Sequence, residues 1–270
     1  MNFNKYFGLT KDYIVAIILL ISIFSSSFYA FTFDNPIIYD AVEYDRIAIS
    51  ITKGHYSRDA LEPYTPTMNR APLYPFFLSI IYRIFGHNYD VVYFFQILLF
   101  SITCFFTYKI SKDLFGKKVA SISGISIALF PTLANYPSYL LSETLFSFLL
   151  IIAIFLLSKS FKLKKTYIFF CSGILLGLVT LTKVVGMLFI LFVIISMIIQ
   201  YRSLRKNFFL NIFILLIGFL ITLSPWSLRN YKTFDTFQIS LRGGHALWMA
   251  ADQLDYSKEQ ILQSIVFNFS

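Results

Sequence analysis

The chain is built from long apolar segments separated by short polar connections. A helix that crosses a bilayer needs roughly 20 mostly apolar residues. The segments that reach or approach this length number seven and are Tyr13–Thr32, Val91–Tyr108, Val119–Tyr136, Tyr139–Leu157, Tyr167–Thr182, Val184–Gln200 and Phe208–Pro225. The pattern therefore predicts an all-α integral membrane protein with about seven transmembrane helices.

Two shorter stretches predict helices that do not cross the membrane. Pro72–Phe85 is apolar but short, and counting it as a span would reverse the direction of every later helix. We expect it to lie in the membrane interface. Residues 43–51 place apolar side chains at helical spacing, which indicates a short amphipathic helix. Both stretches belong to residues 33–90, which we expect to form an outer loop of juxtamembrane helices.

The basic residues predict how the helices are oriented. More than half of the 23 lysines and arginines lie at the N-terminus and in the connections after the second, fourth and sixth segments. The positive-inside rule assigns these four regions to the cytoplasm. Residues 33–90 and the turns at Pro137–Glu143 and Thr180–Lys183 are then extracytoplasmic. We therefore expect a multi-pass protein of the cytoplasmic membrane with a cytoplasmic N-terminus.

Composition supports an integral membrane protein and argues against a nucleic-acid-binding protein. Apolar residues make up 57% of the chain, charged residues only 14%, and the mean hydropathy is +0.69. A soluble domain has about 25% charged residues. A net charge of +9 can indicate nucleic-acid binding, but the basic residues are spread among the connections and form no single patch. We therefore expect no nucleic-acid partner.

Ionisable residues next to the apolar segments are the candidates for function. Insertion scales put the cost of a charge at bilayer depth at ~2.5–3.5 kcal/mol. Asp40, Arg70, Glu143 and Lys183 are such residues, and the predicted topology brings all of them to the outer face. Each also has an ordinary explanation: a helix N-cap for Asp40, a lipid-phosphate anchor for Arg70, a carboxylate at the water boundary for Glu143 and a turn for Lys183.

Together these groups favour transfer chemistry on a lipid-linked phosphate. A carboxylate can act as general acid or base, and a guanidinium can clamp a phosphate through two parallel hydrogen bonds. The sequence has no Gly-x-Gly-x-x-Gly or P-loop motif for a nucleotide. A sugar donor is therefore expected to arrive on a polyprenyl phosphate rather than on a nucleotide.

Eight short sequence motifs, taken together in their order along the chain, indicate a resemblance to a known family. They occupy Asp40–Ala48, Gly54–Tyr56, Arg70–Leu78, Ile84–Gly86, Leu114–Gly116, Ser142–Phe146, Gly177–Lys183 and Pro225–Tyr231. With them the chain resembles the C-type (GT-C) glycosyltransferase superfamily over roughly residues 13–250. Within that superfamily it is similar to protein O-mannosyltransferases and aminoarabinose–lipid A transferases.

The resemblance implies an inverting sugar transfer from a polyprenyl-phosphate donor to a protein, lipid or glycan acceptor. It implies Asp40 as the general base, with Arg70, Lys183 and Arg229 as cations for the leaving phosphate. We expect Glu43 to bind substrate together with these cations. Glu143 matches a second catalytic carboxylate, which contacts a metal in some members and the acceptor in others. The resemblance therefore does not decide whether the protein binds a divalent metal.

Departures from the family pattern keep other functions open. Ala41 stands where many relatives have a second acid, and Asn69 stands where the aminoarabinose transferases have a glutamate. Relatives also continue with further spans. We therefore expect residues 1–225 to form the membrane module and residues 226–270 to be an extracytoplasmic tail that begins a missing region, which a second polypeptide would supply. One alternative is an inactive remnant or partner subunit that binds polyprenyl phosphate. A small transporter is the weaker alternative, because no inverted repeat is evident.

Overall fold

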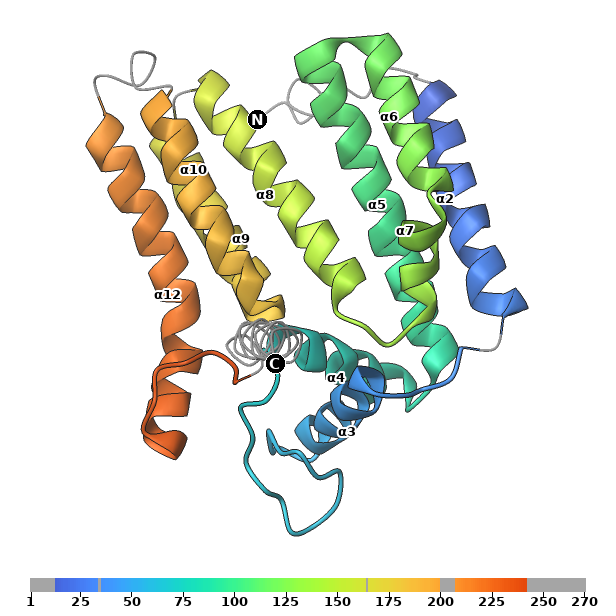
Figure 1. Ribbon diagram of the computed structural model, residues 1–270, viewed down its shortest axis with the longest axis vertical. Helices are drawn as coiled ribbons and strands as arrows, with labels where there is room; N and C mark the ends of the chain where they lie inside the picture. Colours follow the sequence, from blue (N-terminus) through green and yellow to red (C-terminus); the bar gives the residue numbers. More distant parts are fainter. Residues whose placement is uncertain (1–12, 34, 164, 200–206, 242–270) are drawn as a thin grey trace, which may run out of the picture.

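A computed structural model of the chain describes residues 13–33, 35–163, 165–199 and 207–241. In these ranges the regular structure is helical (Figure 1). The α-helices are α2 (Tyr13–Thr32), α3 (Asp40–Thr52), α4 (Leu73–Phe85), α5 (Tyr89–Phe115), α6 (Lys117–Leu129), α7 (Pro131–Asn135), α8 (Glu143–Leu163), α9 (Thr166–Thr182), α10 (Met187–Ile199) and α12 (Phe208–Phe234). Two 3₁₀ turns, η1 (Tyr136–Ser138) and η2 (Val184–Gly186), join them.

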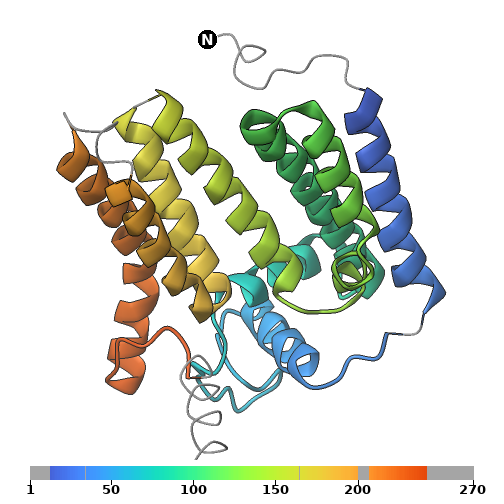
Figure 2. The same cartoon turned by 45° about the horizontal axis from the view of Figure 1, so that its top comes forward.

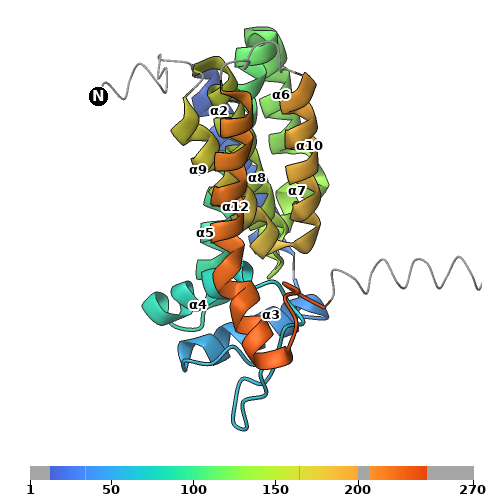
Figure 3. The ribbon, with the colours of Figure 1, turned by 90° about the vertical axis from the view of Figure 1, so that its left-hand side faces the viewer.

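The helices form an upright bundle with a crosswise cap. Helices α2, α5, α6, α8, α9, α10 and α12 run side by side, and α3 and α4 lie across one end (Figures 1 and 2). Seen from the side, the bundle is thin and the cap projects beyond it (Figure 3). This end, which we call the capped end, also carries the start of α8 and the end of α9.

The apolar helices confirm the predicted class of all-α membrane protein. Helices α2, α5, α8 and α12 are long and apolar enough to cross a bilayer. Helix α6 with the α7–η1 segment makes a fifth candidate, bent by 55°. The apolar helices α4, α9 and η2–α10 are shorter. The expected number of seven spans therefore stays a prediction, although every expected segment contains a helix.

One expected span is broken, and another continues beyond its expected end. The segment expected to span from Val119 to Tyr136 breaks at Phe130, which is extended (φ −69°, ψ 114°) and precedes Pro131 at the start of α7. A proline disfavours the helical conformation in the residue before it. Helix α12 instead continues through Pro225 to Phe234, beyond its expected end.

Glycines allow α9 and α12 to approach closely. A Cβ atom on Gly173 would lie 2.1 Å from the carbonyl oxygen of Leu215, and one on Gly218 would lie 2.5 Å from that of Phe170. Small residues at helix contacts are typical of membrane proteins, where backbones pack directly against each other. This contact fixes the end of α9, which carries Lys183, relative to α12.

A buried glutamine ties the cap to the bundle. Gln96 of α5 is fully buried and accepts a hydrogen bond from the Tyr74 hydroxyl of α4 (3.0 Å). Its amide donates to the carbonyl oxygens of Pro137 (3.0 Å) and Tyr139 (2.8 Å). Since these residues lead into α8, one side chain positions both the crosswise helix α4 and the start of α8 at Glu143.

A second polar cluster holds α3 against its neighbours. Asp45 of α3 is buried and accepts hydrogen bonds from Tyr82 of α4 (2.7 Å) and Tyr89 of α5 (3.2 Å). His87 lies 2.9 Å from the same carboxylate. The desolvation of Asp45 is therefore compensated by three partners, which fix the orientation of α3 and of the Asp40 carboxylate at its start.

Candidate active site

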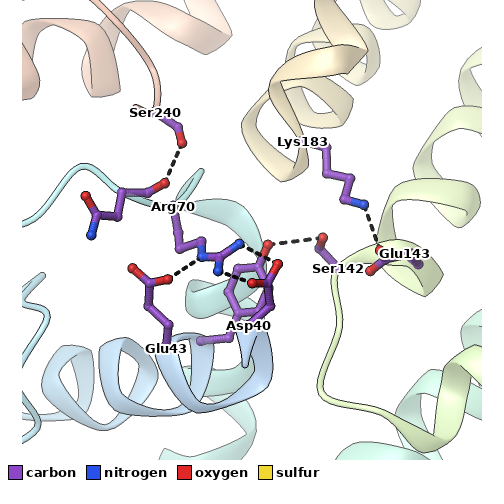
Figure 4. Close-up of polar contacts among 9 residues, drawn as sticks. Asp40, Glu43, Arg70, Ser142, Glu143, Lys183 and Ser240 are labelled. Carbon is purple, nitrogen blue, oxygen red and sulfur yellow. Dashed lines mark hydrogen bonds and ion pairs between the residues drawn. The ribbon is translucent and has the colours of Figure 1, made fainter. Parts of the chain in front are cut away.

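The candidate site begins with an arginine held by two acids. Arg70 donates to both carboxylate oxygens of Asp40 (2.7 and 2.5 Å) and to Glu43 (2.7 Å) (Figure 4). Asp40 is the first residue of α3 and Glu43 follows one turn later, so both point to one side of the helix. Arg70 comes from the segment before α4 and is only 6% exposed. The chain thus places a buried cation between two acids from a different element.

This arrangement keeps Arg70 charged. Burial lowers the pKa of its guanidinium, but the hydrogen bonds and the Coulomb attraction of Asp40 and Glu43 outweigh burial and raise the pKa above its ordinary value. The Asp40 side chain is 42% exposed, whereas that of Glu43 is 13% exposed. Asp40 is therefore the member of the cluster that a substrate can reach.

A second ion pair lies at the same end of the bundle. The Lys183 ammonium is 2.7 Å from the Glu143 carboxylate (Figure 4). Glu143 is the first residue of α8, and Lys183 is extended at the end of α9. Their side chains are 25% and 35% exposed. This pair explains how two lone charges in apolar stretches of the sequence are tolerated.

Tyr44 connects the two pairs, and the sequence analysis did not identify it as a site residue. Its hydroxyl donates to the Ser142 hydroxyl (3.3 Å), directly before Glu143. The Arg70 guanidinium carbon lies 4.9 Å from the centre of the Tyr44 ring. Burial raises the pKa of Tyr44, although the Ser142 hydrogen bond opposes this effect. The four predicted residues are therefore brought together as two neighbouring ion pairs with a neutral phenol between them.

Arg229 lies elsewhere at the capped end. It donates to the carbonyl oxygens of Thr67 (2.8 Å) and Tyr56 (3.3 Å) and packs over the Trp226 ring. Tyr56 in turn donates to the carbonyl oxygen of Arg70 (3.0 Å). Arg229 thus supports the loop that presents Arg70. Its predicted role as a phosphate ligand stays a prediction.

The residues around Glu143 do not fit a divalent metal. Within the described ranges, no three His, Cys, Asp or Glu side chains are grouped where they could hold a metal ion. One oxygen of Glu143 also contacts the Lys183 ammonium, and a second cation at that oxygen would be repelled. We therefore derive no step through a metal.

Comparison with known proteins identifies the family. Residues 69–228 match the family model described as dolichyl-phosphate-mannose-protein mannosyltransferase. The chain belongs to this mannosyltransferase family. No curated protein and no solved structure matches the chain. The family match includes Arg70, Glu143 and Lys183, whereas Asp40 and Glu43 precede the matched region and are joined to it by Arg70.

Family membership establishes the general activity. Together with the apolar helices, it makes the protein a multi-pass membrane glycosyltransferase of the GT-C type. The family also implies, in general terms, a lipid-linked sugar donor and an acceptor. It does not by itself assign a chemical role to the two ion pairs.

Proposed function

We propose that the protein transfers a sugar from a polyprenyl phosphate to an acceptor hydroxyl on the outer face of the cytoplasmic membrane, with Asp40 as general base. The main support is the bonding of Asp40 to Arg70, which joins an accessible carboxylate to a phosphate-compatible cation. The distribution of basic residues supports the outer orientation, because it assigns the capped end to the extracytoplasmic side.

The proposed reaction is a single displacement. The acceptor oxygen attacks the anomeric carbon while its proton passes to Asp40. The bond between that carbon and the phosphate oxygen breaks, and the phosphate leaves on its lipid with the bonding electrons. Attack from the opposite side inverts the configuration. A positioned base contributes ~10²–10⁴-fold to such a step.

Arg70 has to exchange partners before this step. In the structure both oxygens of Asp40 accept hydrogen bonds from Arg70, which makes the carboxylate a poor base. A donor phosphate offers the same bidentate geometry and a larger negative charge. We propose that the phosphate takes the place of Asp40 on Arg70, while Glu43 continues to hold the guanidinium. Donor binding then frees the base.

Lys183 and Glu143 serve the same site in this proposal. Lys183 supplies a second cation for the leaving phosphate, which acquires charge in the transition state. Glu143 orients Lys183 through their 2.7 Å contact and provides the second carboxylate near the acceptor. The acceptor is a protein, a lipid or a glycan, and Arg229 contributes by holding the loop that precedes Arg70.

Transfer by purified protein in proteoliposomes tests the assignment of the base. With a polyprenyl-phosphate sugar as donor, Asp40→Asn should reduce kcat by ~10²–10⁴-fold, the contribution of a general base. Asp90→Asn is the matched control, because Asp90 is exposed at the start of α5. Equal rates for parent and Asp40→Asn would refute the base. Donor binding without turnover by the parent would instead indicate a non-catalytic subunit.

A further inference from the structure

A cavity lies inside the helix bundle on the far side of Glu143 from the cap. It has a volume of about 200 Å³ and is lined by residues of α5, the α6–η1 segment and α8. Its wall is mainly apolar, with Phe100, Leu133 and Ile151 among the lining residues. Ile154, which also lines it, is 39% exposed on the helix surface. In a membrane protein such a surface faces lipid, so ligands reach the cavity from the bilayer.

Two neighbouring residues that line this cavity each carry a buried oxygen without a partner. Glu143 and Thr144 both line it, and Glu143 Oε2 and Thr144 Oγ1 are buried without a hydrogen bond in the described part of the chain. Thr144 is only 4% exposed. By contrast, Thr103 and Thr107 in the same wall donate to backbone carbonyl oxygens. Buried polar groups are almost always paired, so these two oxygens point to a ligand.

We propose that the cavity binds a neutral, hydroxyl-bearing membrane lipid whose hydroxyl donates to Glu143 and accepts from the Thr144 hydroxyl. A carboxylate oxygen can only accept, so the ligand has to donate. An anionic head group would be repelled by Glu143, whose other oxygen already contacts Lys183. A rotation of the Glu143 carboxyl group presents Oε2 to the ligand. Thr144 can then both donate and accept.

The dimensions fit one end of such a lipid. A cavity of about 150 Å³ in another protein holds a benzene molecule. A volume of about 200 Å³ therefore admits only the short apolar stretch next to the hydroxyl, and the remaining chain lies in the bilayer. This site goes beyond the proposed function, because the ligand lacks the phosphate that Arg70 and Lys183 would bind.

Photolabelling of the purified protein in detergent tests the site. The probe is farnesol with a diazirine on its isoprenoid chain, and the readout is labelling of α8. Ile151→Trp fills the cavity and should reduce labelling at least fivefold. Thr144→Val removes one oxygen with little change of shape and should reduce labelling about threefold. Ile122→Trp is the control, because Ile122 is 67% exposed on α6 and does not line the cavity.

Competition shows whether the hydroxyl is recognised. Unlabelled farnesol should compete about tenfold better than farnesyl methyl ether, because the ether cannot donate to a charged acceptor. Farnesyl phosphate should also compete poorly. Equal competition by farnesol and its ether, or full labelling of Ile151→Trp, would overturn the site and indicate unspecific lipid contact.

Two further measurements separate binding from other effects. Thr144→Val should not lower the melting temperature of the unliganded protein, because an unpaired buried hydroxyl does not stabilise the fold. A clear decrease would show a structural role and contradict the proposal. Arg70→Ala should abolish sugar transfer and leave farnesol labelling unchanged, so the failure of one proposal is distinguishable from the failure of the other.

Discussion

At the scale of residues, Arg70 is the side chain on which the site depends. It is 6% exposed and compensates two carboxylates on α3. Replacing it by an apolar residue removes the 2.7 Å ion pair between Arg70 and Glu43, whose side chain is 13% exposed. Removing one partner of a buried pair costs about 3–5 kcal/mol. Because Asp40 is partly exposed, we expect Arg70→Met to cost about 3 kcal/mol, measured as unfolding in detergent.

A second change distinguishes charge from packing. If Arg70→Met destabilises the protein because the Arg70–Glu43 ion pair is lost, Glu43→Gln in the Arg70→Met background should restore part of the lost stability. Arg58→Met is the control, because Arg58 is exposed in the loop between α3 and α4. Equal destabilisation by Arg58→Met and Arg70→Met would contradict the structural role of the Arg70 cluster.

The sequence could indicate some of these residues and not others. Glu143 and Lys183 are isolated charges in apolar surroundings, where the energetic cost of charge makes them conspicuous. Their mutual pairing agrees with the predicted common face. Tyr44 gave no such signal, because a tyrosine on an amphipathic helix is ordinary. Its position between Arg70 and Ser142 depends on how α3 packs against the start of α8, which no local pattern encodes.

At the scale of elements, the contact between α9 and α12 is the least tolerant of added volume. A Cβ atom on Gly173 would meet the backbone oxygen of Leu215 at 2.1 Å, and backbone cannot move aside without shifting α12. We expect Gly173→Ala to cost about 1–3 kcal/mol, the usual effect of overpacking. It should also displace Lys183 at the end of α9 and reduce sugar transfer.

Gly124 provides the matched control for this prediction. A Cβ atom there would also be close to a neighbour, 2.5 Å from Ile18, but the contacted atom is the end of a flexible side chain. Gly124→Ala should therefore change the melting temperature less than Gly173→Ala. A larger effect at Gly124 would show that the α9–α12 contact is not the tight one. Differential scanning fluorimetry in detergent measures both variants.

Helix positions were more predictable than helix shapes. Hydropathy located the apolar helices of the described residues, because burial in lipid requires only local composition. The bend after α6 follows from Phe130 and Pro131, but Pro225 lies inside the continuous helix α12, so a proline alone does not predict a break. The continuation of α12 through Pro225 depends on its packing against α9, where Gly218 allows close contact. Such tertiary causes explain why boundaries were missed.

At the scale of the whole molecule, the proposed function requires one orientation in the membrane. Asp40, Arg70, Glu143 and Lys183 lie at the capped end, and the turn between α5 and α6 lies at the other (Figure 1). Lys117 and Lys118 at the start of α6 belong to the basic clusters that predict a cytoplasmic location. The capped end is then outside, where the transfer is proposed to occur.

Single cysteines measure this orientation directly. In a background with Cys104 and Cys171 replaced by alanine, we expect a membrane-impermeant maleimide to label Asp59→Cys in intact bacterial spheroplasts. Lys118→Cys should be labelled only after permeabilisation. Lys118 is exposed and Asp59 is partly exposed, and the start of α6 lies at the opposite end of the bundle from α3 and α4. The reverse pattern would place Asp40 and Arg70 in the cytoplasm. The outer-face transfer would then be excluded, whereas the two ion pairs and the lipid cavity would stand on their own evidence.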